Sequence, residues 1–240
     1  MGIGYSASAF HRISYLVEGE DTASIVEPPP WLRNIGIEGI RRHTGPMRFH
    51  SPLVEGIELW REGFAARQEP QIGEIVSWDE ANDFSLSEDV YASDDTMLRY
   101  VAAVVEVEGE KAARRLVGAE RPGYPEIGRI FDSFDGVSEL LRFPQLLLTD
   151  LYWLPYHRNV VVDDEDWQGE RHRFGSTFRL ADELRDLRTL IAALDPNAIE
   201  GAESFETPLP PLPAAWRVSE VVVKICGAAV ERKLPLWTTG

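Results

Sequence analysis

The chain has 240 residues, of which 44% are hydrophobic and 27% charged, a composition typical of a globular protein with one large core. Its 40 acidic residues against 24 lysines and arginines give a formal net charge of −16, which disfavours nucleic acid and anionic membranes as partners. We expect no membrane-spanning helix, no secretion signal and, with Cys226 as the single cysteine, no intramolecular disulfide. Of the basic residues 21 are Arg, a bias that suggests a bacterial source, and a cytoplasmic location fits best.

The N-terminal quarter of the chain predicts little regular structure before a first long helix. Residues 2–9 are small and flexible in character, and residues 15–17 begin an extended segment. Three prolines at 28–30 then interrupt regular structure. Ser51-Pro52 predicts a helix start, and the helical spacing of the apolar residues that follow extends this helix to about Arg67.

The middle of the chain predicts strand and turn followed by a second helix. Residues 71–90 have apolar side chains at shorter spacings between polar ones, which is typical of strands and turns. A helix begins at Asp94 or Asp95, whose carboxylates suit the exposed amides of a helix N-terminus, and runs to Val107. Pro125 predicts the start of a further short helix.

The second half predicts two strands and the clearest helix of the chain. Residues 146–156 are densely apolar and aromatic and residues 160–162 are β-branched, so we expect a strand in each. The acidic segment 163–170 is predicted to be a surface loop. Ser176 or Thr177 then caps a helix whose apolar stripe ends at Leu194.

A proline-rich connector at 207–213 precedes the last predicted helix, whose apolar residues span 218–230. Only about 27 residues follow the connector, fewer than the roughly 40 that usually fold alone. We therefore predict a single globular domain over 1–240. Its fold class is α+β, with several amphipathic helices packed on a small, mostly antiparallel sheet.

The sequence contains no catalytic signature. A nucleophile elbow needs a glycine on both sides of its serine, and Gly4-Tyr5-Ser6-Ala7-Ser8 has only the first. Glycine-rich phosphate-binding motifs are absent. Cys226 lies in an apolar helical stripe, where a thiol is buried and inert. We assign no catalytic and no cofactor-binding residue.

No metal site is predicted either. The five histidines, at 11, 43, 50, 157 and 172, do not have the spacing of zinc ligands, so we expect structural or surface roles for them. Asp164-x-Asp166-x-Gln168-Gly169 has the beginning of a calcium loop, but Gly175 stands where a bidentate glutamate is required. This segment is better interpreted as a solvated loop.

The acidic residues concentrate in two stretches. Between Glu69 and Asp95 there are nine acidic residues and no Lys or Arg, together with enough apolar residues to anchor the stretch on a core. A second cluster follows at 163–170. An acidic, solvated surface without a specific partner would explain both stretches, and so would an ordered docking face. Our candidate contact residues for a basic partner are Glu74, Asp79, Glu80, Asp83, Glu88, Asp89, Asp94, Asp95, Asp163, Asp164, Glu165 and Asp166.

The last third of the chain resembles a known class of bacterial proteins. The resemblance rests on Leu154-Pro155, on the helix start Gly175-Ser176 with Leu180 and Leu184, and on Leu234-Pro235-Leu236. It covers about 85 residues. These features are similar to those of immunity proteins, which are encoded beside polymorphic or contact-dependent toxins and block the active site of the cognate toxin. No functional residue is carried over from this resemblance.

These observations favour a cytosolic, non-enzymatic immunity protein that binds and neutralises a basic toxin through an acidic face. Many such toxins engage anionic substrates through basic clefts, and an acidic inhibitor competes for the cleft by charge complementarity. Two other hypotheses stay open: a hydrolase with a carboxylate-lined pocket, and an acidic DNA mimic or scaffold protein. The sequence leaves the toxin's identity and the oligomeric state open.

Overall fold

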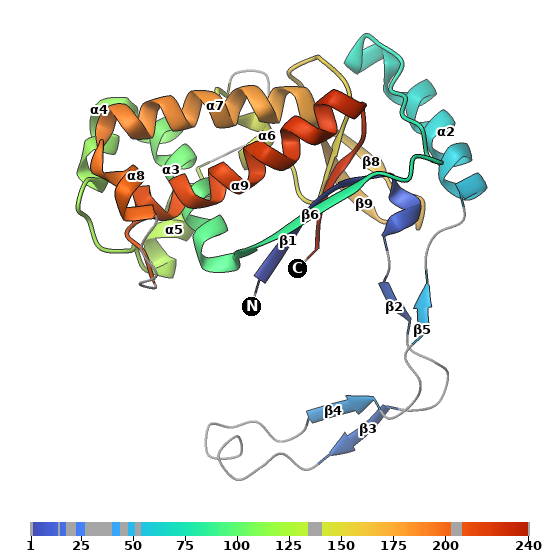
Figure 1. Ribbon diagram of the computed structural model, residues 1–240, viewed down its shortest axis with the longest axis horizontal. Helices are drawn as coiled ribbons and strands as arrows, with labels where there is room; N and C mark the ends of the chain where they lie inside the picture. The colour runs from blue at the N-terminus through green and yellow to red at the C-terminus, as the bar shows by residue number, and fades with distance from the viewer. Residues whose placement is uncertain are drawn as a thin grey trace.

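The computed structural model describes residues 2–13, 15–17, 23–26, 40–43, 48–50, 54–133, 141–202 and 208–239. The predicted α+β class is confirmed: a six-stranded sheet is covered by helices (Figure 1). The expected interruption at 28–30 and the expected helix start at Ser51-Pro52 lie outside the described residues.

The central sheet has the strand order β6-β1-β10-β7-β9-β8, which leaves β6 and β8 at its edges. Its neighbours are antiparallel except for the parallel pair β7 and β9. The six strands are β1 (Gly2–Ser8), β6 (Ser85–Tyr91), β7 (Tyr152–Leu154), β8 (Val162–Glu165), β9 (Arg171–Ser176) and β10 (Leu236–Thr239). Two separate ladders join β2 (Tyr15–Val17) to β5 (Arg48–His50) and β3 (Ala23–Val26) to β4 (Ile40–His43).

Long helices flank this sheet. The longest are α2 (Val54–Ile72), α3 (Ala92–Glu108), α7 (Thr177–Leu194) and α9 (Pro211–Arg232). The shorter ones are η1 (Phe10–Arg12), α4 (Glu110–Ala113), η2 (Arg114–Leu116), α5 (Tyr124–Phe131), α6 (Pro144–Leu147) and α8 (Asn197–Ala202). Within the described residues, no helix is both long and apolar enough to cross a bilayer.

The two faces of the sheet carry different cores. Because side chains alternate along a strand, neighbouring residues such as Trp153 and Tyr152 point to opposite faces. Trp153 joins the larger core, formed with α3, α7 and α9, whereas Tyr152 joins a second, aromatic core with α2 and η1. Figure 1 shows α3, α7 and α9 together on one side and α2 near β8 and β9. The aromatic core positions the candidate site.

The helix patterns in the second half of the chain are largely confirmed. The side chain of Ser176 accepts a hydrogen bond from the Arg179 amide and caps α7, as predicted. The last helix starts earlier than expected, at Pro211, within the predicted connector 207–213. Prolines are tolerated in the first turn of a helix, where the missing N–H has no intrahelical partner, so the helix includes Pro213 as well.

Several strands differ from the sequence expectations, and β1 and β8 differ most clearly, because the sequence predicts other structure for their residues. Residues 2–9, expected to be flexible, contribute β1, which lies in the sheet interior between β6 and β10. Small residues suit this position: a side chain at Gly4 would meet the Thr239 Oγ1 atom at 2.6 Å. Residues 163–165, expected to be a loop, form most of the edge strand β8 through pairing with β9. The partners of β1 lie far along the chain, and the charged sequence of β8 does not have the alternation typical of a strand.

Gly175 provides a test of the close packing between β7 and β9. An added Cβ would lie 2.3 Å from Thr149 Oγ1, 2.6 Å from Trp153 Cδ1 and 2.7 Å from Gln145 Oε1. We expect Gly175→Ala to lower the free energy of unfolding by about 1–3 kcal/mol, because the buried neighbours must move. Gly227→Ala in α9 has open space and should instead stabilise by about 0.5–1 kcal/mol. Urea denaturation checks both; equal effects would contradict this packing.

Candidate functional site

Four of the predicted contact residues lie inside the protein: Glu80, Asp94, Asp95 and Asp166. Glu80 accepts a hydrogen bond from the Trp78 indole, and Asp94 forms ion pairs with Arg121 and Arg217. These carboxylates already have internal partners, as buried charges require. Their assignment to an exposed docking face is therefore corrected.

Asp95 belongs to a buried network that joins β1 to α3. It accepts a hydrogen bond from the Tyr5 hydroxyl and pairs with Arg99 at 3.3 Å. Arg99 in turn donates to the carbonyls of Leu146 and Thr149. Burial, and then the Asp95 charge, raise the pKa of Tyr5 well above its ordinary value. Burial alone would lower the pKa of Arg99, but Asp95 and Tyr5 hold it above its ordinary value. The network keeps the tyrosine neutral and the arginine charged.

The remaining predicted contact residues reach the surface, several of them beside a cation. The exposed ones are Asp79, Asp83, Asp89, Asp163 and Glu165, and the half-buried ones are Glu74, Glu88 and Asp164. The Asp164 side chain is only 8% exposed and pairs with Arg67. Ion pairs at the surface join Asp83 to Arg12, Glu88 to Lys224, and Glu74 to His157 if that ring is protonated. Exposed pairs of this kind contribute only about 0–1 kcal/mol each, so a partner can displace them.

Glu74 is held more firmly than the others. Burial would raise the pKa of its carboxyl, but hydrogen bonds from the backbone amide and ring of His157 lower it overall. Glu74 therefore stays ionised and fixes the start of the loop between α2 and β6.

One side of α2 closes the β8 edge of the sheet. The Trp60 indole donates to the Glu165 carbonyl at 2.6 Å, and the Gln68 amide donates to the Asp163 carbonyl at 3.3 Å. Gln68 and Arg67 also bind the Asp164 carboxylate. Open strand edges present unpaired backbone groups to other chains, and these side chains satisfy two of them. Asp164 is the first residue of the calcium-loop pattern, and its carboxylate is bound by Arg67 and Gln68.

Trp60 is the common anchor of the acidic segments. Its ring lies 6.1 Å from that of Trp78, in the loop 73–84, and 5.6 Å from that of Trp167, in the β8–β9 turn. Phe10 from η1 contacts all three indoles. The loop and the turn are therefore fixed relative to each other by one aromatic cluster, and the acidic residues they carry are fixed with them.

A cavity of about 560 Å³ opens between α2 and β8. Its walls contain four carboxylates and two guanidinium groups, and the lining residues are Trp60, Arg67, Gln68, Asp163, Asp164, Glu165, Asp166 and Arg171. Gln68 Oε1 is buried and has no hydrogen-bond partner among the described residues. The cavity is thus polar and net acidic, and one of its buried polar atoms has no hydrogen-bond partner among the described residues.

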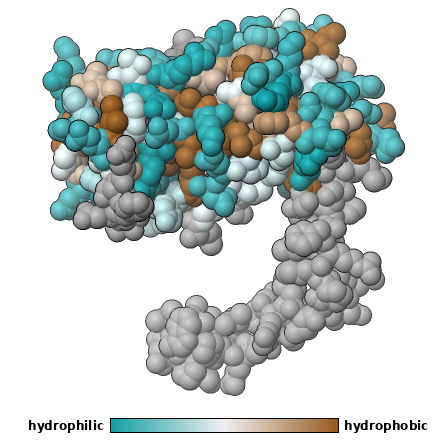
Figure 2. All heavy atoms as spheres, viewed as in Figure 1, coloured by the Kyte–Doolittle hydropathy of each residue, from teal (hydrophilic) through white to brown (hydrophobic). Residues whose placement is uncertain are grey.

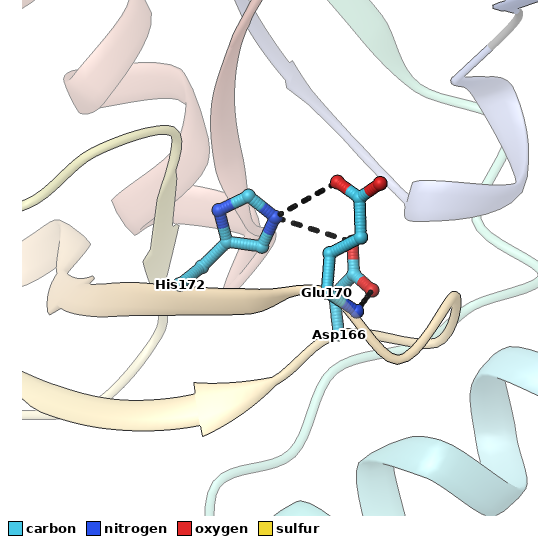
Figure 3. Close-up of side chains that lie close together, drawn as sticks. All are labelled: Asp166, Glu170 and His172. Atoms are coloured by element: carbon cyan, nitrogen blue, oxygen red, sulfur yellow. Dashed lines mark hydrogen bonds and ion pairs between the residues drawn. The ribbon is translucent and has the colours of Figure 1, made fainter.

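Asp166, Glu170 and His172 converge at the turn between β8 and β9. Figure 3 shows the His172 ring and the Glu170 carboxylate pointing toward each other, with Asp166 beside them. His172 Nε2 lies 3.5 Å from Asp166 Oδ2 and 3.8 Å from Glu170 Oε2. The potential ligand atoms of the three residues all lie within 4.8 Å of one another.

The sequence alone does not indicate this group, because Asp166 is expected in a docking loop and His172 in a structural or surface role. The available signal was the Asp-x3-Glu-x-His spacing, which a tight hairpin can bring to one point. The spacing becomes informative only once β8 and β9 are known to pair, with Asp164 opposite His172.

No family model, curated protein or solved structure matches this chain.

The burial of Asp95 can be tested by substitution. Asp95→Ala removes the partner of Arg99 and of the Tyr5 hydroxyl, and we expect it to lower the free energy of unfolding by about 3 kcal/mol. The exposed Asp89 is the matched control, and Asp89→Ala should change the free energy by less than about 0.5 kcal/mol. Equal effects in chemical denaturation would contradict a structural role for Asp95.

Proposed function

We propose that this protein acts in the bacterial cytoplasm as a non-enzymatic immunity protein, which binds a basic toxin and blocks it. The docking face consists of the exposed carboxylates of the loop 73–84 and of the β8–β9 hairpin: Asp79, Asp83, Asp163, Glu165 and Glu170. The observation that carries this proposal is their common anchorage, because both segments pack on the indole of Trp60.

Rigid anchorage matters because an acidic surface gains specificity only when its charges have fixed positions. A preorganised face does not lose conformational freedom on binding, so more of the contact energy contributes to affinity. The aromatic cluster supplies this rigidity under both segments. In the space-filling view hydrophilic and hydrophobic residues interleave over the visible face (Figure 2).

The net charge of −16 supports the same partner class. A surface of one sign accelerates the encounter with an oppositely charged protein by roughly 10-fold to 1000-fold, and salt weakens the effect. The surface ion pairs with arginines leave the acidic residues available, since exposed pairs are weak and exchange readily. A basic toxin cleft would replace the arginines of the free protein.

Association kinetics with the product of the adjacent gene test the proposal. A variant with lysine at Asp79, Asp83, Asp163 and Glu165 should associate at least about 10-fold more slowly at low salt, because the steering field is reversed. It should also fail to protect cells that express the partner. Unfolding curves check that the variant remains folded.

A matched variant distinguishes the effect of where the charges lie from the effect of the total charge. It carries lysine at four exposed acidic residues of the helical side, namely Glu120, Asp132, Glu200 and Glu220. This control should keep most of the association rate although its net charge is the same. If both variants associate equally slowly, or neither is slowed, the proposed face is wrong.

A hydrolase remains the second candidate, because the cavity beside β8 is lined by carboxylates. Paired carboxylates perform acid–base catalysis when their environments push their pKa values apart. Turnover of ester, phosphoester or glycoside substrates, abolished by Asp164→Asn and retained in Asp89→Asn, would favour this function over immunity.

A further inference from the structure

We propose that Asp166, Glu170 and His172 form a binding site for a divalent metal ion of the zinc class, at the rim of the cavity between α2 and β8. This site does not depend on the proposed docking function. It requires only the three side chains that converge at the β8–β9 turn (Figure 3).

The distances between the ligand atoms fit coordination of a shared metal ion better than they fit direct hydrogen bonds. Hydrogen bonds between nitrogen and oxygen are about 2.7–3.2 Å long, whereas the His172 Nε2 atom lies 3.5 and 3.8 Å from the two carboxylate oxygens. Zinc binds nitrogen and oxygen ligands at about 2.0–2.2 Å, so neighbouring ligands in a tetrahedral site lie about 3.3–3.6 Å apart. Small side-chain adjustments would bring all three atoms to this distance.

Asp166 is the most firmly fixed of the three candidate ligands. Its side chain is only 1% exposed, so its charge must be compensated inside the protein. Its Oδ1 atom accepts hydrogen bonds from the amides of Gln168 and Glu170. Its Oδ2 atom faces the His172 ring, with Nε2 at 3.5 Å. The two backbone hydrogen bonds therefore fix this carboxylate with its second oxygen turned toward His172, as a shared metal ion would require.

The hairpin holds Asp166 and His172 in place before any metal arrives, and it places the exposed Glu170 side chain beside them. The Asp166 amide donates to the Glu170 carbonyl at 2.8 Å, and Gly169 adopts a φ of 82°, which allows the tight turn. The His172 ring packs edge-on against Tyr152 at 5.2 Å, so its orientation is fixed by the aromatic core. Preorganised ligands reduce the free energy needed to assemble a site.

The ligand set selects the class of metal. Calcium takes 6–8 oxygen ligands, and this site offers one imidazole nitrogen and two carboxylates. Zinc accepts such mixed nitrogen and oxygen sets, and three protein ligands leave a fourth position for water. Asp166 also lines the cavity, so that position would be accessible from solvent.

Calorimetric titration of the full chain with zinc chloride, after treatment with a chelator, tests the site. We expect one zinc ion per chain, and saturating zinc should raise Tm because the metal binds the folded state. His172→Ala and Glu170→Gln should each weaken zinc binding by at least about 10-fold and remove the rise in Tm. Glu170 is exposed, so Glu170→Gln keeps the test valid if His172→Ala does not fold.

His157→Ala is the matched control. His157 also contacts a carboxylate, that of Glu74, but no third potential ligand lies near this pair among the described residues. This variant should bind zinc as the wild type does. The proposal is overturned if the wild type binds no stoichiometric zinc, if it binds calcium in preference to zinc, or if His157→Ala weakens binding as much as His172→Ala. Zinc binding by a chain that fails to bind any basic partner would leave this site intact and reject the docking function alone.

Discussion

The packing of the Trp60 indole fixes the acidic side of this protein in one arrangement. Its N–H group satisfies the Glu165 carbonyl at the open edge of the sheet, and its ring contacts Trp78 and Trp167. Burial of aromatic side chains contributes the largest hydrophobic gains available to a core. Here the same contacts hold a helix, a loop and a hairpin in one arrangement. The cavity, the acidic surface and the Asp166 cluster all lie around this arrangement.

The acidic residues fall into two groups with different physical roles. Glu80, Asp94 and Asp95 are buried and stabilise the fold through internal hydrogen bonds and ion pairs. The exposed carboxylates give the surface its charge and are free to exchange their weak partners. Net charge alone cannot distinguish these groups. The burial of each carboxylate does distinguish them, since a carboxylate shielded from water must have a partner within the protein.

The sequence predicted the elements whose signals are local. The α7 helix follows its apolar stripe and the Ser176 cap, and the α+β class follows from the mixture of helical and strand patterns. The strand β1 could not be predicted, because its short residues gain their stability from β6 and β10, which lie far along the chain. Strand β8 was assigned to a loop because its charged sequence has no strand pattern of its own.

The candidate site was only partly predictable for the same reason. Asp94 and Asp95 have the pattern of acidic residues that begin an exposed helix, and that helix does begin close to them, at Ala92. Their side chains nevertheless face arginines and a tyrosine from other elements, and the partner Tyr5 lies 90 residues away. His172 and Asp166 likewise meet only because two strands pair. Long-range contacts of this kind leave no periodic signal in the sequence.

Hydrogen–deuterium exchange of the complex with the product of the adjacent gene is the sharpest test of docking through the two acidic segments. We expect new protection in both the loop 73–84 and the turn 163–170, because both segments are anchored on Trp60. Protection confined to the helices α7 and α9, or to only one of the two segments, would contradict it.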